Sequence, residues 1–361
     1  HMSKNILEFC LSPDLGGLEL FMANCFRDFK TKTNCKVIVE KGKKLDQNLE
    51  NEEKYHVKRN KFFPMIPALR VAKFIDEHEI DIIHFHWTRD IATVVLARVL
   101  SKRKPKIIQT RNMTMTRFKD DVYHKWLYKN INTMHAVTYQ VKEQLQKFIP
   151  KDVQPKVEVV YMGTKAKEIK ASTRESLRKK YNLHDEFIVG IVGRIEEEKG
   201  QFLVIDAIYK LKELNIKAMI VGHTMDEAYL KSLKKKVKDL GIEDKVIFTG
   251  FTNEVDAHMT LFDTNILATP KETFGLVVIE AMINRVCMIA VNNAGPLEII
   301  EDGVDGLLFD RSADDLSLKI ELLYHDEDYK NRLALAGYEK AKEKFDSVKQ
   351  NAKLYNIMQS M

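Results

Sequence analysis

The chain has 361 residues, 45% of them hydrophobic and 30% charged, which is typical of a globular protein too long for one ordinary core. Charged residues interrupt every apolar run, so the sequence predicts no membrane-spanning helix, and the first apolar stretch is too short for a signal peptide. The four cysteines (Cys10, Cys25, Cys35 and Cys287) have neither paired nor metal-ligand spacing. We therefore expect buried thiols and a cytoplasmic protein.

The net charge of +6 is unevenly distributed along the chain. Residues 1–170 hold 32 Lys and Arg against 20 Asp and Glu, whereas residues 171–361 hold 26 against 32. The basic half is suited to an anionic membrane, an anionic acceptor or nucleic acid, or its lysines simply serve solubility. No nucleic-acid-binding motif accompanies the charge, so we expect no nucleic-acid partner.

The first half of the chain alternates apolar strand-like segments with segments of helical period. The strand-like segments are residues 5–11, 36–40, 81–86, 106–110, 136–138 and 157–161. A turn with Gly16 and Gly17 follows the first of them, and the lysine-rich stretch 41–61 has no clear period, which predicts a surface loop or a mobile excursion. This alternation predicts a doubly wound α/β sheet.

A second α/β series begins after residues 162–167. Strands are predicted at 187–192, 217–221, 246–248, 264–267 and 288–291, with helices at 200–213, 226–240 and 275–284. The predicted fold class is therefore α/β, with two doubly wound Rossmann-like domains facing across a cleft. Because ligands bind at the carboxyl ends of parallel strands, we expect one site shared between the domains.

Arg194 and Lys199 follow the predicted strand 187–192 in the sequence GRIEEEKG. A guanidinium and an ammonium beside a helix N-terminus form an anion site, since the guanidinium can bind two phosphate oxygens. The alternative is a surface Arg and Lys that offset Glu196, Glu197 and Glu198. Gly16 and Gly17 also precede a helix, but they lack the third glycine of a dinucleotide fingerprint.

The stretch ETFGLVVIE places Glu272 just before a predicted helix start and Glu280 inside the helix. Gly275 and Leu276 begin that helix, so their amides are available to an anion. A carboxylate accepts hydrogen bonds from two vicinal hydroxyls, which suits Glu280 to a ribose and Glu272 to a hexose. The alternative is a pair of ordinary surface acids on one helix.

Taken together, these motifs resemble the retaining glycosyltransferases of family 4, which have the GT-B fold. The resemblance rests on GG near the start, GRIEEEKG, ETFGLVVIEAM, DIIHFH (81–86), VYMGT (160–164), VIFTGF (246–251) and NNAGPLEIIEDGVDGLLF (292–309). It covers nearly the whole chain and is most specific from residue 190 to 309. It implies an acceptor-binding domain at 1–165, a nucleotide-sugar-binding domain at 166–345, and a C-terminal helix at 346–361 that packs back on the first domain.

The resemblance also implies roles for individual residues. Arg194 and Lys199 would hold the diphosphate, and Glu272 would hold the sugar; these three are the expected catalytic residues. Glu280 would hold the ribose. The remaining donor-site residues are expected to line the sugar, phosphate and base, and they are Gly16, Gly17, Phe248, Thr249, Gly250, Phe251, Phe274, Gly275 and Leu276. No metal and no cofactor beyond the nucleotide sugar, expected to be a UDP-sugar, would be required.

Two departures from the family pattern bear on this interpretation. Arg111 stands where many relatives have a histidine near the sugar, so it binds an anionic sugar or acceptor group, or it is a surface arginine. Arg285 and Cys287 stand where a glycine and a proline usually follow the helix of Glu280. His86, at the end of a strand, is expected to line the cleft, while the adjacent Trp87 stacks on a sugar or caps the core.

The sequence therefore predicts a retaining, metal-independent glycosyltransferase that moves a hexose or N-acetylhexosamine to a cell-envelope glycan or glycolipid. Lipopolysaccharide core, capsule and lipid-linked oligosaccharide are the expected acceptors, on the inner face of the membrane. The cation-rich and aromatic stretch 117–129 is interpreted as an amphipathic helix on an anionic membrane or as an ordinary packed helix. The alternatives are a nucleotide-sugar epimerase of the same fold and a non-catalytic nucleotide-sugar-binding protein.

Overall fold

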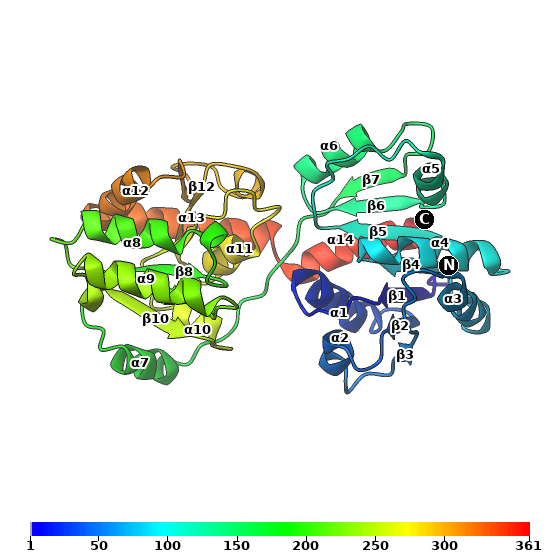
Figure 1. Ribbon diagram of the computed structural model, residues 1–361, viewed down its shortest axis with the longest axis horizontal. Helices are drawn as coiled ribbons and strands as arrows, with labels where there is room; N and C mark the ends of the chain where they lie inside the picture. Colours follow the sequence, from blue (N-terminus) through cyan, green and yellow to red (C-terminus); the bar gives the residue numbers. More distant parts are fainter. Residues whose placement is uncertain (1) are drawn as a thin grey trace. The chain divides into compact units, whose positions relative to one another are not determined.

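The structure is a computed structural model that describes residues 2–361, and the chain divides into two compact units. Unit 1 consists of the chain up to Tyr161 together with Gln350–Met361, and unit 2 is Met162–Lys349. Each unit contains its own parallel sheet flanked by helices (Figure 1). The chain therefore enters unit 2 after Tyr161 and returns to unit 1 within its last helix.

Unit 1 is built on a parallel sheet with the strand order β3-β2-β1-β4-β5-β6-β7. The strands are β1 (Ile6–Cys10), β2 (Cys35–Val39), β3 (Tyr55–His56), β4 (Ile82–Phe85), β5 (Lys106–Arg111), β6 (Thr133–Ala136) and β7 (Lys156–Val159). The helices are α1 (Gly17–Phe29), α2 (Lys44–Asn48), α3 (Met65–Glu77), α4 (Ile91–Leu100), α5 (Val122–Lys129) and α6 (Tyr139–Phe148). The strand order reverses between β1 and β4, which makes their carboxyl ends the expected ligand position of this sheet.

Unit 2 repeats the plan with the order β10-β9-β8-β11-β12-β13. Its strands are β8 (Phe187–Val192), β9 (Ile216–Val221), β10 (Val246–Gly250), β11 (Thr264–Leu267), β12 (Cys287–Val291) and β13 (Leu307–Phe309). Its helices are α7 (Ala171–Lys180), α8 (Gln201–Lys210), α9 (Glu227–Asp239), α10 (Val255–Met259), α11 (Leu276–Ile283), α12 (Ala313–His325) and α13 (Glu327–Lys344). Here the order reverses between β8 and β11.

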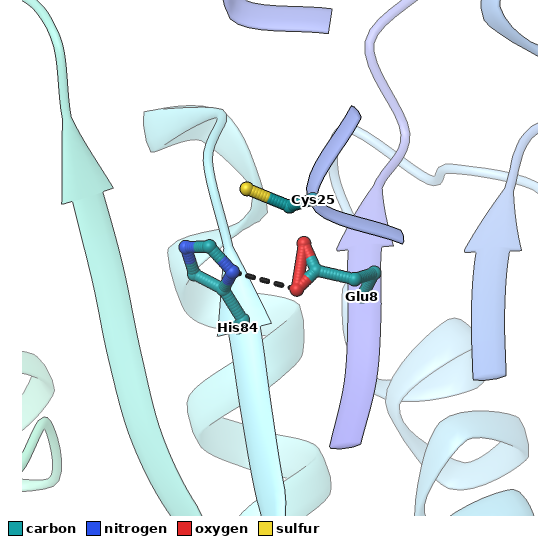
Figure 2. A group of neighbouring side chains, drawn as sticks. All are labelled: Glu8, Cys25 and His84. Carbon is teal, nitrogen blue, oxygen red and sulfur yellow. Dashed lines mark hydrogen bonds and ion pairs between the residues drawn. The ribbon is translucent and has the colours of Figure 1, made fainter. Parts of the chain in front are cut away.

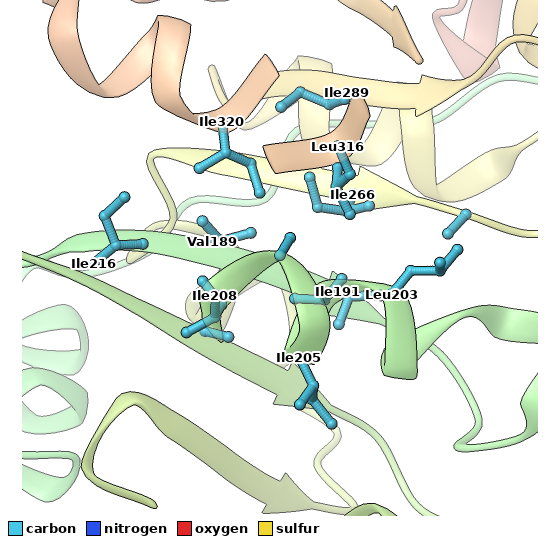
Figure 3. Close-up of a cluster of buried hydrophobic side chains, with 14 of the residues drawn as sticks. Val189, Ile191, Leu203, Ile205, Ile208, Ile216, Ile266, Ile289, Leu316 and Ile320 are labelled. Carbon is cyan, nitrogen blue, oxygen red and sulfur yellow. The ribbon is translucent and has the colours of Figure 1, made fainter. Parts of the chain in front are cut away.

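The core of unit 2 is formed by β-branched strand residues that meet aliphatic residues of α8 and α12 (Figure 3). Val189 and Ile191 of β8 and Ile266 of β11 are almost fully buried under this layer. Near-continuous apolar strands are characteristic of parallel sheets covered on both faces. This packing fixes the carboxyl ends of β8 and β11, from which the candidate site projects.

The last helix, α14 (Ser347–Ser360), begins in unit 2 and ends in unit 1. Leu354 and Met358 are buried in the core cluster of unit 1 that also contains residues of α1. The Lys4 amide also donates a hydrogen bond to Gln359 Oε1 at 2.7 Å, which ties the end of the helix to the start of the chain.

The prediction of two doubly wound parallel sheets is confirmed, and the structure corrects two local predictions. The stretch 41–61 is not wholly loop, because it contains α2 and the two-residue strand β3. The predicted helix over 117–129 begins only at Val122, because the Asp121 side chain accepts from the amide of His124 and caps it there. No helix among residues 2–361 combines the length and hydrophobicity needed to span a bilayer.

Candidate functional site

A cavity of about 170 Å³ lies in unit 2 at the carboxyl ends of β8 and β11, where the strand order reverses. Its lining includes four residues that the sequence analysis singled out, namely Lys199, Glu272, Gly275 and Leu276. The remaining lining comes from the ends of the two strands, the loop after β11 and Val277 of α11. A cation, a carboxylate and a helix start therefore converge on one small cavity at the expected ligand position.

Lys199 reaches this cavity because Gly200 lets the start of α8 approach β11. Gly200 has φ of 79°, and a Cβ atom built there would lie 2.7 Å from the Cβ of Ala268. Any other residue at position 200 would be strained and would push α8 away from the end of β11. Lys199 and the first residues of α11 consequently line the same cavity.

The loop that carries Glu272 is held by a second glycine, Gly295. The amide of Gly295 donates to the carbonyl of Glu272 at 2.8 Å, and a Cβ at Gly295 would lie 2.5 Å from the carbonyl oxygens of Thr273 and Phe274. The loop leads into Gly275, which caps α11 with φ of 104°. The first amides of α11 are thereby directed to the cavity end of the helix, where they attract an anion.

Arg194 does not line the cavity. Its side chain is 59% exposed and lies 3.4 Å from Glu196, while its carbonyl accepts a hydrogen bond from the side chain of the buried Gln201. The backbone of this residue is therefore fixed, but the guanidinium extends into solvent. An exposed ion pair of this kind is weakly held and can exchange for a phosphate.

Glu280 lies on the fifth residue of α11 and is half-buried. Burial, followed by the neighbouring Asp256, raises the pKa of Glu280 to about 7, with Lys167 acting in the opposite direction. Asp256 is itself bound by Lys167 Nζ at 3.0 Å and by Asn284 Nδ2 at 3.0 Å. Glu280 is not among the residues that line the 170 Å³ cavity, so Glu272, in the loop before α11, and Glu280, within α11, do not share this cavity.

Phe248, Thr249, Gly250 and Phe251 lie at the end of β10, on the same carboxyl edge of the sheet. Gly222, which follows β9, links this edge to β10 because its amide donates to the carbonyl of Gly250 at 3.3 Å. Phe251 is 73% exposed, and its ring meets that of His223 edge-on with centroids 5.8 Å apart. An exposed aromatic ring at this edge can stack on a planar base.

Phe274 was expected to line the sugar site, but its side chain is only 3% exposed and packs edge-on against Phe345. Gly16 was expected to contact the diphosphate, yet its amide already donates to Glu19 Oε2 at 2.8 Å, and Glu19 also accepts from the Ser12 hydroxyl. Gly17 begins α1 directly after it. The Gly16 amide is thus used in capping the helix.

Unit 1 has a larger cavity, of about 690 Å³, at the carboxyl ends of its strands. Both unit 1 residues proposed to contact acceptor or sugar, His86 and Arg111, line it, and Trp87 does so as well. Arg111 is half-buried, and its guanidinium donates to Thr88 Oγ1 and to the carbonyls of Met113 and Thr114. These two residues are therefore brought together in one cavity within unit 1.

Beneath this cavity lies a buried polar network that sequence reasoning missed. His135 Nε2 donates to the carbonyl of Val160 at 2.7 Å, so its Nδ1 accepts from the Thr110 hydroxyl at 2.9 Å. The Thr110 oxygen in turn accepts from His84 Nε2 at 2.6 Å, and His84 Nδ1 donates to Glu8 Oε2 at 2.6 Å (Figure 2). This hydrogen-bond pattern gives His84 two protons, which makes it the cationic partner of Glu8.

The charges of the network agree with this pattern. Burial alone would raise the pKa of Glu8, but His84 and His86 outweigh it, so the pKa is lowered and the carboxylate stays ionised. Burial lowers the pKa of His135 to about 3, which keeps that ring neutral. The available sequence signals were the acid at Glu8 inside an otherwise apolar strand and, in another strand, two histidines spaced two apart, His84 and His86.

Glu8, Cys25 and His84 also approach one another closely enough to be considered as metal ligands (Figure 2). Both ring nitrogens of His84 are already engaged by Glu8 and Thr110. Burial raises the pKa of the Cys25 thiol well above its usual value, so the sulfur stays protonated. The donor set suits an internal hydrogen-bond network, since a metal requires the thiolate and a free imidazole nitrogen.

Two family models match the chain over most of its length. The model described as Glycosyl transferases group 1 matches residues 173–340, and the model described as Glycosyl transferase 4-like matches residues 8–140. The first match includes Lys199, Glu272 and the start of α11. The second includes His86 and Arg111.

Individual proteins agree with these matches. The chain is 25% identical over 359 residues to the putative glycosyltransferase EpsD of Bacillus subtilis, which covers 93% of this chain and 91% of EpsD. It is 26% identical over 153 residues to the lipopolysaccharide core biosynthesis glycosyltransferase LpsE of Rhizobium meliloti, covering 42% of this chain and 44% of LpsE. Several curated relatives are matched over less than half of their own length.

Among solved structures, Anabaena HepE in complex with UDP superposes with a TM-score of 0.85 at 20% sequence identity, covering 99% of this chain and all of HepE. The TM-score shows a common fold, and at this low sequence identity it shows the fold alone. The two parallel sheets, the two family models and the nearly full-length match to EpsD show that the chain belongs to the group 1 glycosyltransferases with the GT-B fold.

Proposed function

We propose that this glycosyltransferase is a retaining, metal-independent enzyme that transfers a hexose or N-acetylhexosamine from a UDP-sugar to a cell-envelope glycan or glycolipid. The observation that carries the proposal is the convergence of Lys199, Glu272 and the first turn of α11 on one cavity in unit 2. A diphosphate fits the cation and the helix start, and sugar hydroxyls fit the carboxylate.

In this proposal the leaving diphosphate gains negative charge as the sugar–phosphate bond breaks. Lys199 and the amides of α11 neutralise that charge from fixed positions, and Arg194 exchanges its exposed partner Glu196 for a phosphate oxygen. These groups supply the electrostatic stabilisation that a divalent cation provides in other transferases. A phosphate oxygen of the donor takes the proton of the acceptor hydroxyl as that hydroxyl attacks from the same face.

The remaining donor contacts follow the carboxyl edge of the sheet in unit 2. Glu272 accepts hydrogen bonds from the sugar, Glu280 from the ribose, and Phe251 stacks on the base. UDP is the proposed nucleotide because HepE, which shares the fold, was solved with it. Residues 166–345 are then the donor domain, and residues 1–165 are the acceptor domain, completed by the C-terminal helix 346–361.

The proposed acceptor is a lipopolysaccharide core, a capsule or a lipid-linked oligosaccharide, in line with the role of LpsE in lipopolysaccharide core biosynthesis. Unit 1 offers a surface for the membrane that bears such acceptors. Its largest exposed apolar side chains at the start of α3 and just before it are Phe62, Phe63, Met65, Ile66 and Leu69. Lys58 and Lys61 flank them, a combination suited to the headgroup region of an anionic bilayer.

The central test is UDP release from UDP-glucose, UDP-galactose and UDP-N-acetylglucosamine, with the anomeric configuration of the product followed by NMR. Lys199→Ala should lower turnover by about 10²-fold or more, because it removes a fixed charge from the departing diphosphate. Lys210→Ala is the matched control, since Lys210 lies on α8 in an exposed ion pair with Asp314. Equal turnover in both variants would refute the role of Lys199, and an epimerised UDP-sugar without UDP release would identify an epimerase instead.

Membrane association is tested separately by flotation with phosphatidylglycerol-containing vesicles at low salt. Phe62→Ser together with Phe63→Ser should abolish flotation, whereas Val348→Ser, at an exposed apolar residue outside the patch, should leave it unchanged. Failure of the unmodified protein to float would refute peripheral membrane binding.

A further inference from the structure

The 690 Å³ cavity of unit 1 is strongly basic. Five cations line it, from the ends of β2, β3, β4 and β5, and they are Lys43, Arg59, Lys61, Arg89 and Arg111. Asp14 and Glu40 are the acidic residues in the lining. The volume lies in the range of small-molecule sites, so the excess charge is directed at a ligand of that size.

Among the described residues, these cations form no ion pair with a carboxylate, although the charge of Arg59 acts on the nearby buried Asp90. Within residues 2–361, no Asp or Glu lies within 4.0 Å of a charged nitrogen of any of the five, although ion pairs are frequent elsewhere on the chain. Arg111 is the clearest case, since it is half-buried and its donors reach only a hydroxyl and two carbonyls. Burial lowers the pKa of Arg111, which reflects the cost of holding this charge without an anion.

Trp87 orders two of the cations. The guanidinium carbon of Arg59 lies 4.9 Å from the centre of the Trp87 ring, and that of Arg89 lies 5.7 Å from it. Cation–π attraction to this one ring therefore helps to hold both guanidinium groups at the cavity wall, where both residues and Trp87 form part of the lining.

His86 supplies a second kind of contact at the same cavity. It is 2% exposed, and its Nε2 donates to Glu8 Oε1 at 2.8 Å, so its Nδ1 carries the lone pair. This Nδ1 is buried and has no hydrogen-bond partner within residues 2–361. Burial and the neighbouring His84 lower the pKa of His86 to about 4, so the ring remains a neutral acceptor for a hydroxyl.

We propose that the unit 1 cavity binds an acidic sugar of the acceptor, with its phosphate or carboxylate on Arg59, Arg89 and Arg111 and one of its hydroxyls donating to His86 Nδ1. This proposal rests on the proposed function, because the ligand of this cavity is an acceptor only if the protein is a glycosyltransferase of that kind. The combination of unpaired arginines and an unpartnered neutral imidazole fits a ligand with both an anionic group and a hydroxyl. A neutral hexose would leave the arginines unpaired, and inorganic phosphate would leave His86 without a donor.

The experiment uses tryptophan fluorescence as a local reporter. The chain has two tryptophans, Trp87 and Trp126, so Trp126→Phe leaves the residue in the cavity wall as the only indole. This full-length variant is titrated with glucose 6-phosphate, glucuronate and glucose, with UDP present in excess to occupy a donor site. We expect saturable changes with an apparent Kd about tenfold or more lower for an acidic probe than for glucose.

Arginine variants are made in the same background. Arg59→Gln and Arg89→Gln should each weaken the acidic probe by about tenfold and leave glucose unchanged. Arg70→Gln removes the same charge from exposed α3 outside this cavity and should have no effect. Circular dichroism verifies that each variant is folded. Because Arg89 is exposed, Arg89→Gln is less prone than Arg59→Gln to disturb folding.

The outcomes separate the possible ligands. Preference for glucose 6-phosphate assigns a phosphorylated acceptor sugar, and preference for glucuronate assigns a uronic acid. The proposal is overturned if glucose binds as tightly as the acidic probes or if no probe gives a saturable change. It is also overturned if Arg70→Gln weakens binding of the acidic probe as much as the cavity variants do. UDP release from a UDP-sugar is measured independently, so failure of the proposed transferase activity and failure of this binding preference are distinguishable.

Discussion

Glu280 of α11 lies beside Asp256 of α10, and this second carboxylate adds to burial in raising the pKa of Glu280 to about 7. Lys167 and Asn284 bind the Asp256 carboxylate, whereas Glu280 has no such partner within residues 2–361. The repulsion between the two acids therefore disfavours the ionised form of Glu280. Placing Glu280 in this environment contributes nothing to the stability of the folded protein, because its ionised form is disfavoured there. Such a residue is characteristic of a ligand site, where the cost is recovered on binding.

We predict that Glu280→Gln stabilises unit 2 at pH 8 by about 2 kcal/mol and has no such effect at pH 4.5. The folded protein binds the Glu280 proton more tightly than the unfolded chain does. The stability from that proton is complete below the unfolded pKa of about 4.5 and is lost as pH rises through about 7. Calorimetric unfolding at both pH values checks this, with Glu213→Gln at an exposed residue as the control. An equal effect at both pH values would contradict the raised pKa.

We also predict that UDP-glucose binds more tightly at pH 8 than at pH 6. Ribose hydroxyls donate to an ionised carboxylate, so the nucleotide sugar selects the deprotonated form of Glu280 and binding releases a proton. Titration calorimetry in two buffers of different ionisation enthalpy measures that proton. Glu280→Gln should bind weakly with no such release, and proton release that persists in the variant would assign the effect to another group.

Gly295→Ala should weaken UDP-glucose binding by about tenfold or more. The new Cβ would lie 2.5 Å from the carbonyl oxygens of Thr273 and Phe274, so the loop of Glu272 must move. The neighbouring Ala294→Gly is the matched variant, since Ala294 has φ of 56° and ψ of −134°, where glycine is unstrained. It should preserve affinity and raise the melting temperature. Unchanged affinity in Gly295→Ala would refute the proposal that this glycine positions the loop of Glu272 for binding.

Glu8→Gln should destabilise unit 1 by about 3–5 kcal/mol, because it leaves the buried cationic His84 without its partner. Both tryptophans lie in unit 1, so urea unfolding followed by their fluorescence reports on this unit alone. Glu50→Gln, at an exposed residue of the same unit, is the control. A midpoint equal to that of the control would show that Glu8 is not ionised in the folded state.

Sequence reasoning singled out several residues of the 170 Å³ cavity in unit 2, because they follow strands or open helices. Lys199, Glu272, Gly275 and Leu276 are all in the cavity lining. It misplaced the Phe274 side chain, because a phenylalanine before a helix gives no indication of which side its ring will occupy. That ring packs against Phe345, 71 positions along the chain, and only tertiary structure reveals such a partner.

The network of Glu8 was missed for a similar reason. A single acid in an apolar strand resembles an edge-strand charge until β1 is known to lie beside β4, which places His84 opposite Glu8. The strand β3 was missed because its two residues are too few to produce a period. Parallel strand order depends on contacts distant in sequence, and these determine both features.

The two crossings between units bear on how hybrid enzymes can be made. Leu354 and Met358, at the very end of the chain, belong to the core of the first unit. A chimera that joins one parent's N-terminal half to another's C-terminal half would therefore import a foreign helix into that core. Exchanging residues 162–349 as an internal cassette keeps each core with its own parent and leaves the last helix with the unit into which it packs.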